Sequence, residues 1–281
     1  MKNLNFAFFG TDDFSEDILA ELKRAGFLPA LIITSPDKPK GRGLKIAPPP
    51  VKLWALANKI DFIQPENFNL QFTTYNLQLG IVASYGKILP AKILASFPKG
   101  VLNVHPSLLP KYRGASPIQT QILNNEKKVG VTIMLMDEKM DHGPILASRE
   151  LEASSLNNQI PNNKELSKKL ATEGGKLLAE TLPKWLADEI KPIPQDDNQA
   201  TFCPKITKKD GLIDLNDNPF QNFLKIQAFV GWPGAYFFTE RNGKKIRAII
   251  KIAQFENGEL KIKSVRPEGK KEISYSQFIS K

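Results

Sequence analysis

The residues best suited to chemistry gather between Asn103 and Gly143. The chain contains two histidines, His105 and His142, and both fall in this stretch together with Asp141. Among side chains, histidine most readily exchanges a proton near neutral pH. The stretch is therefore the first place to look for a site that moves protons.

The spacing of Asn103 and His105 suggests what such a site would do. Residues 101–105 read as a short apolar strand, and positions two apart on a strand project to the same side. An amide N–H and an imidazole N–H can stabilise the oxyanion that forms when an amine attacks a carbonyl carbon. Asp141, just beyond the predicted strand 129–136, is suited to accept the amine proton and to orient His105. This pattern predicts acyl transfer between nitrogen atoms.

A structural interpretation of the same residues stays open. A lone histidine at a strand end is more often structural than catalytic, and Asp141–Gly143 also has the composition of a simple turn. We expect His142 to have a turn or surface role. His105 differs, because it shares a strand face with Asn103 and precedes a segment bracketed by Pro106 and Pro110.

Other kinds of chemistry find little support in the composition. The single cysteine, Cys203, cannot form an internal disulfide, and one cysteine with two histidines does not make a zinc set. No serine lies in a nucleophile elbow, and no apolar run is long enough to span a bilayer. The N-terminus has no signal-peptide pattern. We therefore expect a cytoplasmic protein that needs neither a metal nor a membrane.

The first 33 residues predict the architecture that positions the site. An apolar strand over 4–9 precedes a helix with Ser15 as N-cap, which ends near Gly26, and 27–33 is a second buried strand. This order predicts a Rossmann-like parallel α/β sheet. Only one glycine lies in the first turn, so the dinucleotide-binding fingerprint is missing.

The elements predicted after this opening alternate in the same way. Strands are expected over residues 61–63, 77–83, 101–105, 129–136 and 145–151, and helices over 51–58, 87–97, 113–125 and 164–190, the last interrupted at Gly174-Gly175 and Pro183.

A basic segment interrupts this pattern at 35–45. Its prolines and glycines forbid a helix, and it carries four cations: Lys38, Lys40, Arg42 and Lys45. One interpretation is a mobile surface loop. The other is a grip on a phosphate backbone, for which a basic loop just past the carboxyl end of a strand is well placed.

The chain is expected to form two domains. A Pro- and Asp-rich stretch marks a linker at 191–206, between a larger domain at 1–190 and a smaller one at 207–281. The smaller domain begins with a helix over 219–229, and alternating strands over 245–255, 260–265 and 273–279 predict an OB-like β-barrel. Its residues carry 14 Lys+Arg against 8 Asp+Glu, more than half of the net charge of +10. That excess favours a polyanionic partner, although a solvated lysine-rich surface explains it too.

The run Asn-Val-His-Pro-Ser-Leu-Leu-Pro at 103–110, followed by Asp-His-Gly-Pro at 141–144, resembles the folate-dependent formyltransferases. Motifs elsewhere resemble the branch that acts on methionyl-tRNA. They are Phe9-Gly10-Thr11, Gly41-Arg42-Gly43, Tyr112–Gln119, Lys205-Ile206, Asp210–Asp214 and Trp232–Ala235. The chain departs from that branch at Asp12, where proline is usual, at Gln227 and Gly231, and in its short C-terminal domain.

The resemblance implies transfer of the formyl group of 10-formyltetrahydrofolate to the α-amino group of methionyl-initiator tRNA. It implies Asn103, His105 and Asp141 as catalytic residues. The folate-binding residues it implies are Ser107, Leu108, Leu109 and Pro110, and the tRNA-binding residues are Lys38, Lys40, Arg42 and Lys45. Two alternatives remain: a formyltransferase acting on an amino-sugar nucleotide, and a catalytically silent tRNA-binding protein.

Overall fold

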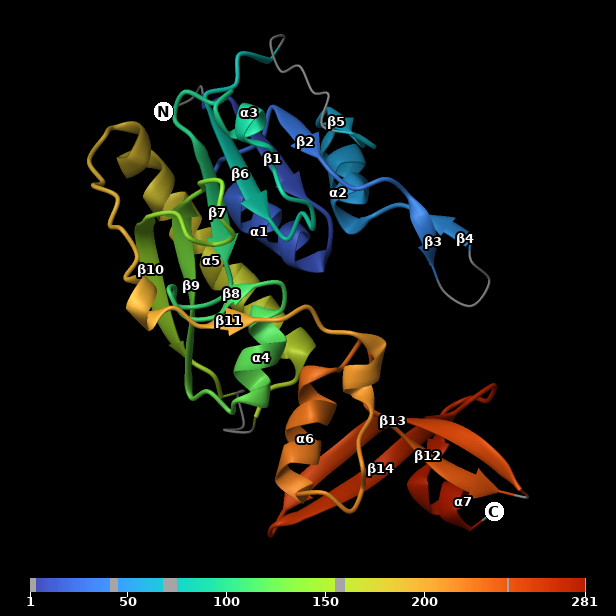
Figure 1. The fold of residues 1–281 in the computed structure, drawn as a ribbon. Coiled ribbons are helices and arrows are strands. Elements are labelled where there is room, and N and C mark those ends of the chain that lie inside the picture. Colours follow the sequence, from blue (N-terminus) through green and yellow to red (C-terminus); the bar gives the residue numbers. More distant parts are fainter. Residues whose placement is uncertain (1–3, 41–44, 68–74, 155–159, 242, 281) are drawn as a thin grey trace. The chain divides into compact units, whose positions relative to one another are not determined.

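The computed structural model describes residues 4–40, 45–67, 75–154, 160–241 and 243–280 (Figure 1). The chain divides into two compact units. Unit 1 comprises Met1–Arg113, Gly130–Leu151 and Lys168–Phe202, and unit 2 comprises Gly114–Val129, Glu152–Ser167 and Cys203–Lys281. The domains expected at 1–190 and 207–281 remain a prediction, because compactness in space does not establish which segments fold independently.

The largest sheet of the described residues has seven strands, in the order β10-β9-β7-β6-β1-β2-β5 (Figure 1). The strands are β1 Phe6–Gly10, β2 Leu31–Ile33, β5 Phe62–Ile63, β6 Leu79–Ala83, β7 Val101–His105, β9 Lys128–Leu135 and β10 Ile145–Glu152. The five strands from β5 to β7 pair in parallel, whereas β9 pairs antiparallel with β7. The expected α/β sheet is therefore confirmed as mostly parallel, and β9 departs from the parallel pairing that was expected.

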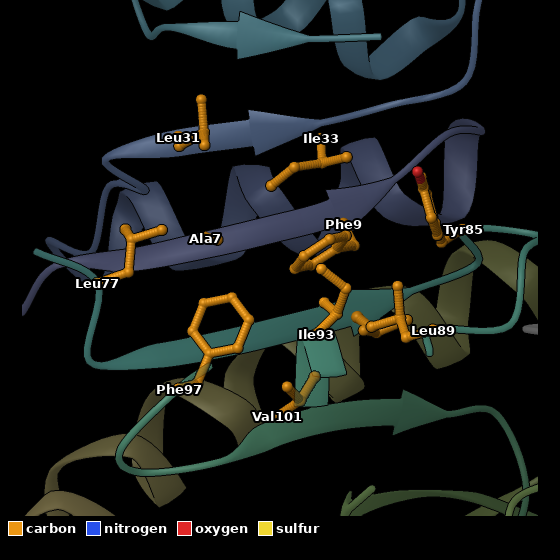
Figure 2. Close-up of a cluster of buried hydrophobic side chains, with 11 residues drawn as sticks. Ala7, Phe9, Leu31, Ile33, Leu77, Tyr85, Leu89, Ile93, Phe97 and Val101 are labelled. Atoms are coloured by element: carbon orange, nitrogen blue, oxygen red, sulfur yellow. The ribbon is translucent and has the colours of Figure 1, made fainter. Parts of the chain in front are cut away.

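The central strands are continuous apolar runs because both faces of the sheet are covered. Every residue of β1, β6 and β7 is buried. Figure 2 shows the cluster on one face, where Phe9 contacts Tyr85 and Phe97 edge-to-face at ring-centroid distances of 5.6 and 6.2 Å. Val101 belongs to this cluster. Since side chains alternate along β7, Asn103 and His105 lie on the same face as Val101.

Helix α5, Asn163–Leu186, is continuous and ends before the predicted residue 190, so the interruptions predicted at Gly174-Gly175 and at Pro183 were both wrong. The two glycines serve packing instead. A Cβ on Gly174 would lie 2.9 Å from Val104 and 3.0 Å from Val131, and one on Gly175 would lie 2.6 Å from the Glu21 Cβ. Gly174 and Gly175 therefore allow α5 to approach β7, β9 and α1 closely.

Other boundaries differ from the predictions as well. Helix α1, Asp13–Arg24, is capped by Asp12 rather than Ser15, because the Asp12 carboxylate accepts from the Ser15 backbone N–H. Strand β2 covers only Leu31–Ile33 of the predicted 27–33, and helix α3 is shortened to Ala91–Leu94 with Pro90 as its N-cap. Helix α4, Pro117–Leu123, begins four residues later than expected, because β8, Arg113–Gly114, pairs with β11, Phe202–Cys203. The second helix is α2, Pro50–Asn58.

The basic segment is a hairpin rather than an irregular loop. Strands β3, Lys38–Lys40, and β4, Lys45–Ala47, pair antiparallel, with Lys38 opposite Ala47 and Lys40 opposite Lys45. Arg42 lies outside the described residues. At the base of the hairpin, Asp37 accepts hydrogen bonds from Lys52 Nζ at 2.8 Å and Gln64 Nε2 at 2.7 Å, and these bonds fix where the hairpin begins.

The C-terminal part of unit 2 is a four-stranded antiparallel sheet with the order β12-β13-β14-β15. Its elements are the 3₁₀ helix η3 Lys208–Gly211, α6 Pro219–Ala228, β12 Tyr236–Arg241, β13 Lys244–Glu256, β14 Glu259–Pro267, β15 Ile273–Ser274 and α7 Tyr275–Ile279. The strand predicted over 273–279 ends at Ser274, so the prediction was wrong for the residues that follow. The Ser274 side chain caps α7 instead. Phe278 of α7 packs in the core against Phe237. Closure of this sheet into an OB-like barrel stays a prediction.

Candidate active site

The three predicted catalytic residues lie together, because Asn103 and His105 both approach one carboxylate oxygen of Asp141. Asp141 Oδ1 lies 3.5 Å from Asn103 Nδ2 and 3.6 Å from His105 Nδ1. Asn103 and His105 are buried in β7, and the Asp141 side chain is 15% exposed. Because β9 runs antiparallel to β7, its carboxyl end lies beside Leu102, and Asp141 reaches the other two residues from the loop that follows β9.

His105 is fixed by its other ring nitrogen. Nε2 lies 3.0 Å from the backbone oxygen of Tyr112. A carbonyl oxygen only accepts, so Nε2 carries a proton and donates it. Nδ1 is then the ring nitrogen that faces Asp141. Their separation of 3.6 Å is longer than a hydrogen bond.

Both loops that complete the site contain a non-glycine residue with positive φ. Tyr112 has a φ of 62° and Asp141 has a φ of 50°. A side chain makes this backbone conformation unfavourable, although aspartate tolerates it better than most residues. Two residues further on, Gly143 lies against β9, where a Cβ would be 1.9 Å from the backbone oxygen of Leu135. The loop therefore leaves no room for a side chain at this position.

The segment 107–110 is held by Thr132 of β9. Thr132 Oγ1 donates to the Ser107 backbone oxygen at 2.7 Å and accepts from the Leu109 backbone N–H at 3.1 Å. The buried Ser107 hydroxyl donates to the Lys111 backbone oxygen at 2.6 Å. Leu109 is buried, whereas Leu108 and Pro110 are partly exposed. These bonds hold Ser107 and Leu109 of the predicted folate-binding segment, which begins two residues after His105.

Gln195 was not identified from the sequence, which placed it in the linker. Its Nε2 donates to the backbone oxygens of Asp141 and Gly143, at 2.9 and 2.7 Å. Its Oε1 accepts from Nε and Nη2 of Arg113, at 3.0 and 2.9 Å. No local pattern marks such a residue, because its partners lie more than fifty positions away along the chain.

The Arg113 guanidinium also contacts Asp197 of η2, Asp197–Gln199, with Nη1 2.9 Å from Oδ1. This hydrogen bond holds the pKa of Asp197 below its usual range, against the opposing effect of desolvation. His142 also lies near Asp197, with Nε2 3.6 Å from Asp197 Oδ2, and its Nδ1 is 2.6 Å from Asp137 Oδ2. His142 is thus bound within its own turn and is not one of the three residues that converge.

The predicted tRNA-binding lysines lie on the hairpin. Lys38 and Lys45 are exposed on β3 and β4, and Lys40 is the last residue of β3. Within the described ranges, no group of three or more His, Cys, Asp or Glu side chains is arranged to hold a metal ion, and no helix there is long and apolar enough to cross a membrane.

Comparison with known proteins defines the class. Residues 2–182 match the family described as formyl transferase. This match covers the whole seven-stranded sheet and the three converging residues. The chain therefore belongs to the formyl transferase family.

The curated relatives are more specific. A methionyl-tRNA formyltransferase of Thermodesulfovibrio yellowstonii is 39% identical over 295 residues, covering 97% of this chain and 94% of the relative. The enzyme of the same name from Dictyoglomus turgidum is 37% identical, covering 99% and 96%. That from Kosmotoga olearia is 42% identical, covering 82% and 75%.

Solved structures share the fold at lower identity. A methionyl-tRNA formyltransferase from Clostridium thermocellum aligns with a TM-score of 0.60 at 18% identity, covering 94% of this chain and 99% of that one. An N-formyltransferase from Helicobacter canadensis, in complex with folinic acid and dTDP-3-aminofucose, aligns with a TM-score of 0.62 at 19% identity, covering 90% and 89%. At this identity the likeness concerns the fold alone.

Proposed function

We propose that this protein transfers the formyl group of 10-formyltetrahydrofolate to the α-amino group of methionyl-initiator tRNA, giving N-formylmethionyl-tRNA for translation initiation. The observation that carries the proposal is the convergence of Asn103 and His105 on Asp141 Oδ1, at 3.5 and 3.6 Å. It occurs in a chain that matches methionyl-tRNA formyltransferases over nearly its full length.

The reaction begins when the free amine of the aminoacyl group attacks the formyl carbon. The carbonyl oxygen becomes an oxyanion, and a donor already in place lowers the barrier at this point. Asn103 Nδ2 is one such donor. His105 is the second when Nδ1 is protonated, since Nε2–H is already bound to the Tyr112 oxygen. The amine then loses a proton, and the formyl carbon separates from the folate nitrogen, which takes up a proton as it leaves.

Asp141 has two roles in this scheme. Its carboxylate faces Nδ1 of His105 and fixes the orientation of the imidazole. It is also the acceptor for the proton of the attacking amine, directly or through a water molecule. The scheme requires these contacts, at 3.5 and 3.6 Å, to shorten as the substrate binds.

The folate co-substrate is assigned to the segment Ser107, Leu108, Leu109 and Pro110. Leu108 and Pro110 are partly exposed apolar side chains, three and five positions after His105 in the chain, and apolar side chains suit a flat heteroaromatic ring. Because the proposed residues supply the oxyanion donors and the proton acceptor, the scheme requires no metal.

The tRNA is assigned to the basic hairpin, through Lys38, Lys40, Arg42 and Lys45, and to the C-terminal region as an OB-like module. Lys38 and Lys45 are exposed, and lysine or arginine side chains fix nucleic acid through its phosphates. The excess of cations beyond Thr207 supports a second contact with the same polyanion. Both substrates belong to translation, so we place the protein in the cytoplasm, free of the membrane.

One competing function comes from the fold. A solved N-formyltransferase with a TM-score of 0.62 was crystallised with a sugar nucleotide, so the sheet alone does not select the acceptor. The relatives with 37 to 42% identity favour tRNA.

The test incubates the purified protein with 10-formyltetrahydrofolate and, in separate reactions, initiator methionyl-tRNA, elongator methionyl-tRNA or an amino-sugar nucleotide. Formylmethionine released from the initiator tRNA is the expected product. Formylation of the sugar nucleotide alone would replace the proposal with the competing function. Tight tRNA binding without any product would favour the catalytically silent protein.

A further inference from the structure

The segment that follows α5 contacts the active site at several points. Ile193 exchanges two backbone hydrogen bonds with Ile145, at 2.8 and 2.9 Å. The Thr201 backbone oxygen accepts from Arg113 N–H at 2.9 Å, and its hydroxyl accepts from Tyr112 N–H at 2.9 Å. Residues 193–201 are thus held at both ends against the loops that carry Asp141 and Tyr112. Gln195 lies between these two anchors.

The orientation of the Gln195 amide follows from its partners. Arg113 is buried and guanidinium groups only donate, so the Gln195 atom that faces it is the acceptor Oε1. The NH₂ group must then face the backbone oxygens of Asp141 and Gly143, which only accept. Both hydrogen atoms of this NH₂ group are therefore used to hold one loop.

That loop has the conformation that most needs support. Asp141 has positive φ, which is unfavourable for a residue with a side chain. Its carboxylate must nevertheless remain beside His105 and Asn103. A hydrogen bond on each side of His142 fixes the peptide units at Asp141 and Gly143, and so determines where the carboxylate points.

We infer that Gln195 is a positioning residue for formyl transfer: it acts through the Asp141 loop, and it couples that loop to the buried guanidinium of Arg113. The inference rests on the proposed function. The hydrogen bonds described above join the Gln195 side chain to Arg113 and to two backbone oxygens of the Asp141 loop. Gln195 would therefore affect catalysis through the loop and not through a direct bond to the Asp141 carboxylate.

The decisive variant is Gln195→Glu. Glutamate keeps an oxygen for Arg113 but has no N–H for the Asp141 and Gly143 carbonyls, so the contact with Arg113 is kept and the loop contact is lost. The matched control is Gln199→Glu, the same change on the same segment at an exposed residue that bonds Asp196. We expect kcat of Gln195→Glu to fall about 10- to 100-fold, as for a misplaced catalytic group. KM for both substrates stays near the unsubstituted value, and the control keeps its kcat.

A second variant guards against misfolding. Gln195→Met keeps the length of the side chain and adds no charge, and it must lose kcat in the same manner. In either variant, backbone amides of residues 138–143 should exchange hydrogen faster than in the unsubstituted protein, a readout that needs no activity. Full kcat in both variants, or a loss caused by a rise in KM alone, overturns the inference.

A double-substitution cycle separates positioning from a general structural effect. In an Asp141→Asn background, Gln195→Glu should cost much less than it does alone, because residues that act as a unit are not additive. Fully additive losses contradict the inference. Failure of the proposed function looks different, because the unsubstituted protein and Gln199→Glu would then both form no formylmethionyl-tRNA.

Discussion

His105 Nε2 lies 3.0 Å from the backbone oxygen of Tyr112, a residue that itself has a φ of 62°. An unfavourable backbone conformation thus supplies the acceptor that determines which imidazole nitrogen is available for chemistry. Only Nδ1 is left to face Asp141 and the reacting carbonyl.

This geometry predicts the tautomer of neutral His105. The proton should lie on Nε2, and ¹⁵N chemical shifts of the imidazole at a pH where it is neutral measure this directly. The chain has two histidines, so a His142→Gln variant assigns the signals. A neutral His105 with its proton on Nδ1 would contradict the assignment of Nδ1 as the reactive nitrogen.

Removal of an oxyanion donor should lower kcat with little change in folding. Asn103→Ala and His105→Ala are each expected to reduce kcat on the order of 10²–10³-fold, the usual effect of losing such a donor. KM for folate should change far less. His142→Gln is the matched control, since His142 bonds Asp137 instead, and it should retain most of the activity. Equal losses in all three variants would refute the distinction between the two histidines.

Short stretches of sequence were enough to predict much of this fold. The central strands β1, β6 and β7 are largely apolar and buried along their whole length, as their sequence predicts, because both faces of the sheet are covered there. The pairing of Asn103 with His105 follows from alternation along one strand, and the geometry agrees. Spacing and burial are properties that a short window of sequence carries.

What escaped prediction depends on distant partners. Gln195 has no periodic context, and its role comes from Arg113 and the Asp141 loop. Gly174 and Gly175 locally predict a break in the helix. In the structure the helix continues, and the two glycines let it pack closely against β7, β9 and α1. Tyr275–Ile279 has the composition of a strand, yet it is a helix because Ser274 caps it and Phe278 enters the core.

The basic hairpin should affect tRNA more than folate. Lys38→Ala with Lys45→Ala is expected to raise KM for tRNA and leave KM for folate unchanged. Each lost phosphate contact should reduce the dependence of log K on log salt by about 0.7–0.9. Lys92→Ala with Lys184→Ala removes the same charge from exposed helical positions and serves as the control. Equal effects on both substrates would argue against the assigned contact. The same design applies to Lys40 and Arg42.

The Arg113–Asp197 pair should make stability depend on pH. The hydrogen bond from Arg113 lowers the pKa of Asp197 in the folded state. Its stabilisation is therefore complete above the unfolded pKa of about 4 and is lost as the pH falls through the lower folded value. Asp197→Asn should thus reduce the unfolding free energy at pH 7 but make little difference near the acid limit. Urea unfolding at several pH values measures the difference in unfolding free energy between the unsubstituted protein and Asp197→Asn. A gap that does not narrow in acid would disprove the linkage.

Gly143 links stability to activity. An added Cβ would lie 1.9 Å from the Leu135 oxygen and 3.2 Å from the Asp137 nitrogen, and both are backbone atoms that a rotamer change cannot move. Gly143→Ala should therefore lower the unfolding free energy by about 1–3 kcal/mol, as overpacking does. Where a glycine site accepts a side chain, the same change stabilises by about 0.4–1 kcal/mol, so the sign is diagnostic. Because the Gly143 oxygen binds Gln195, kcat should fall too. Urea unfolding and steady-state kinetics check both effects, and an unchanged or higher midpoint would show that the loop has room for the methyl group.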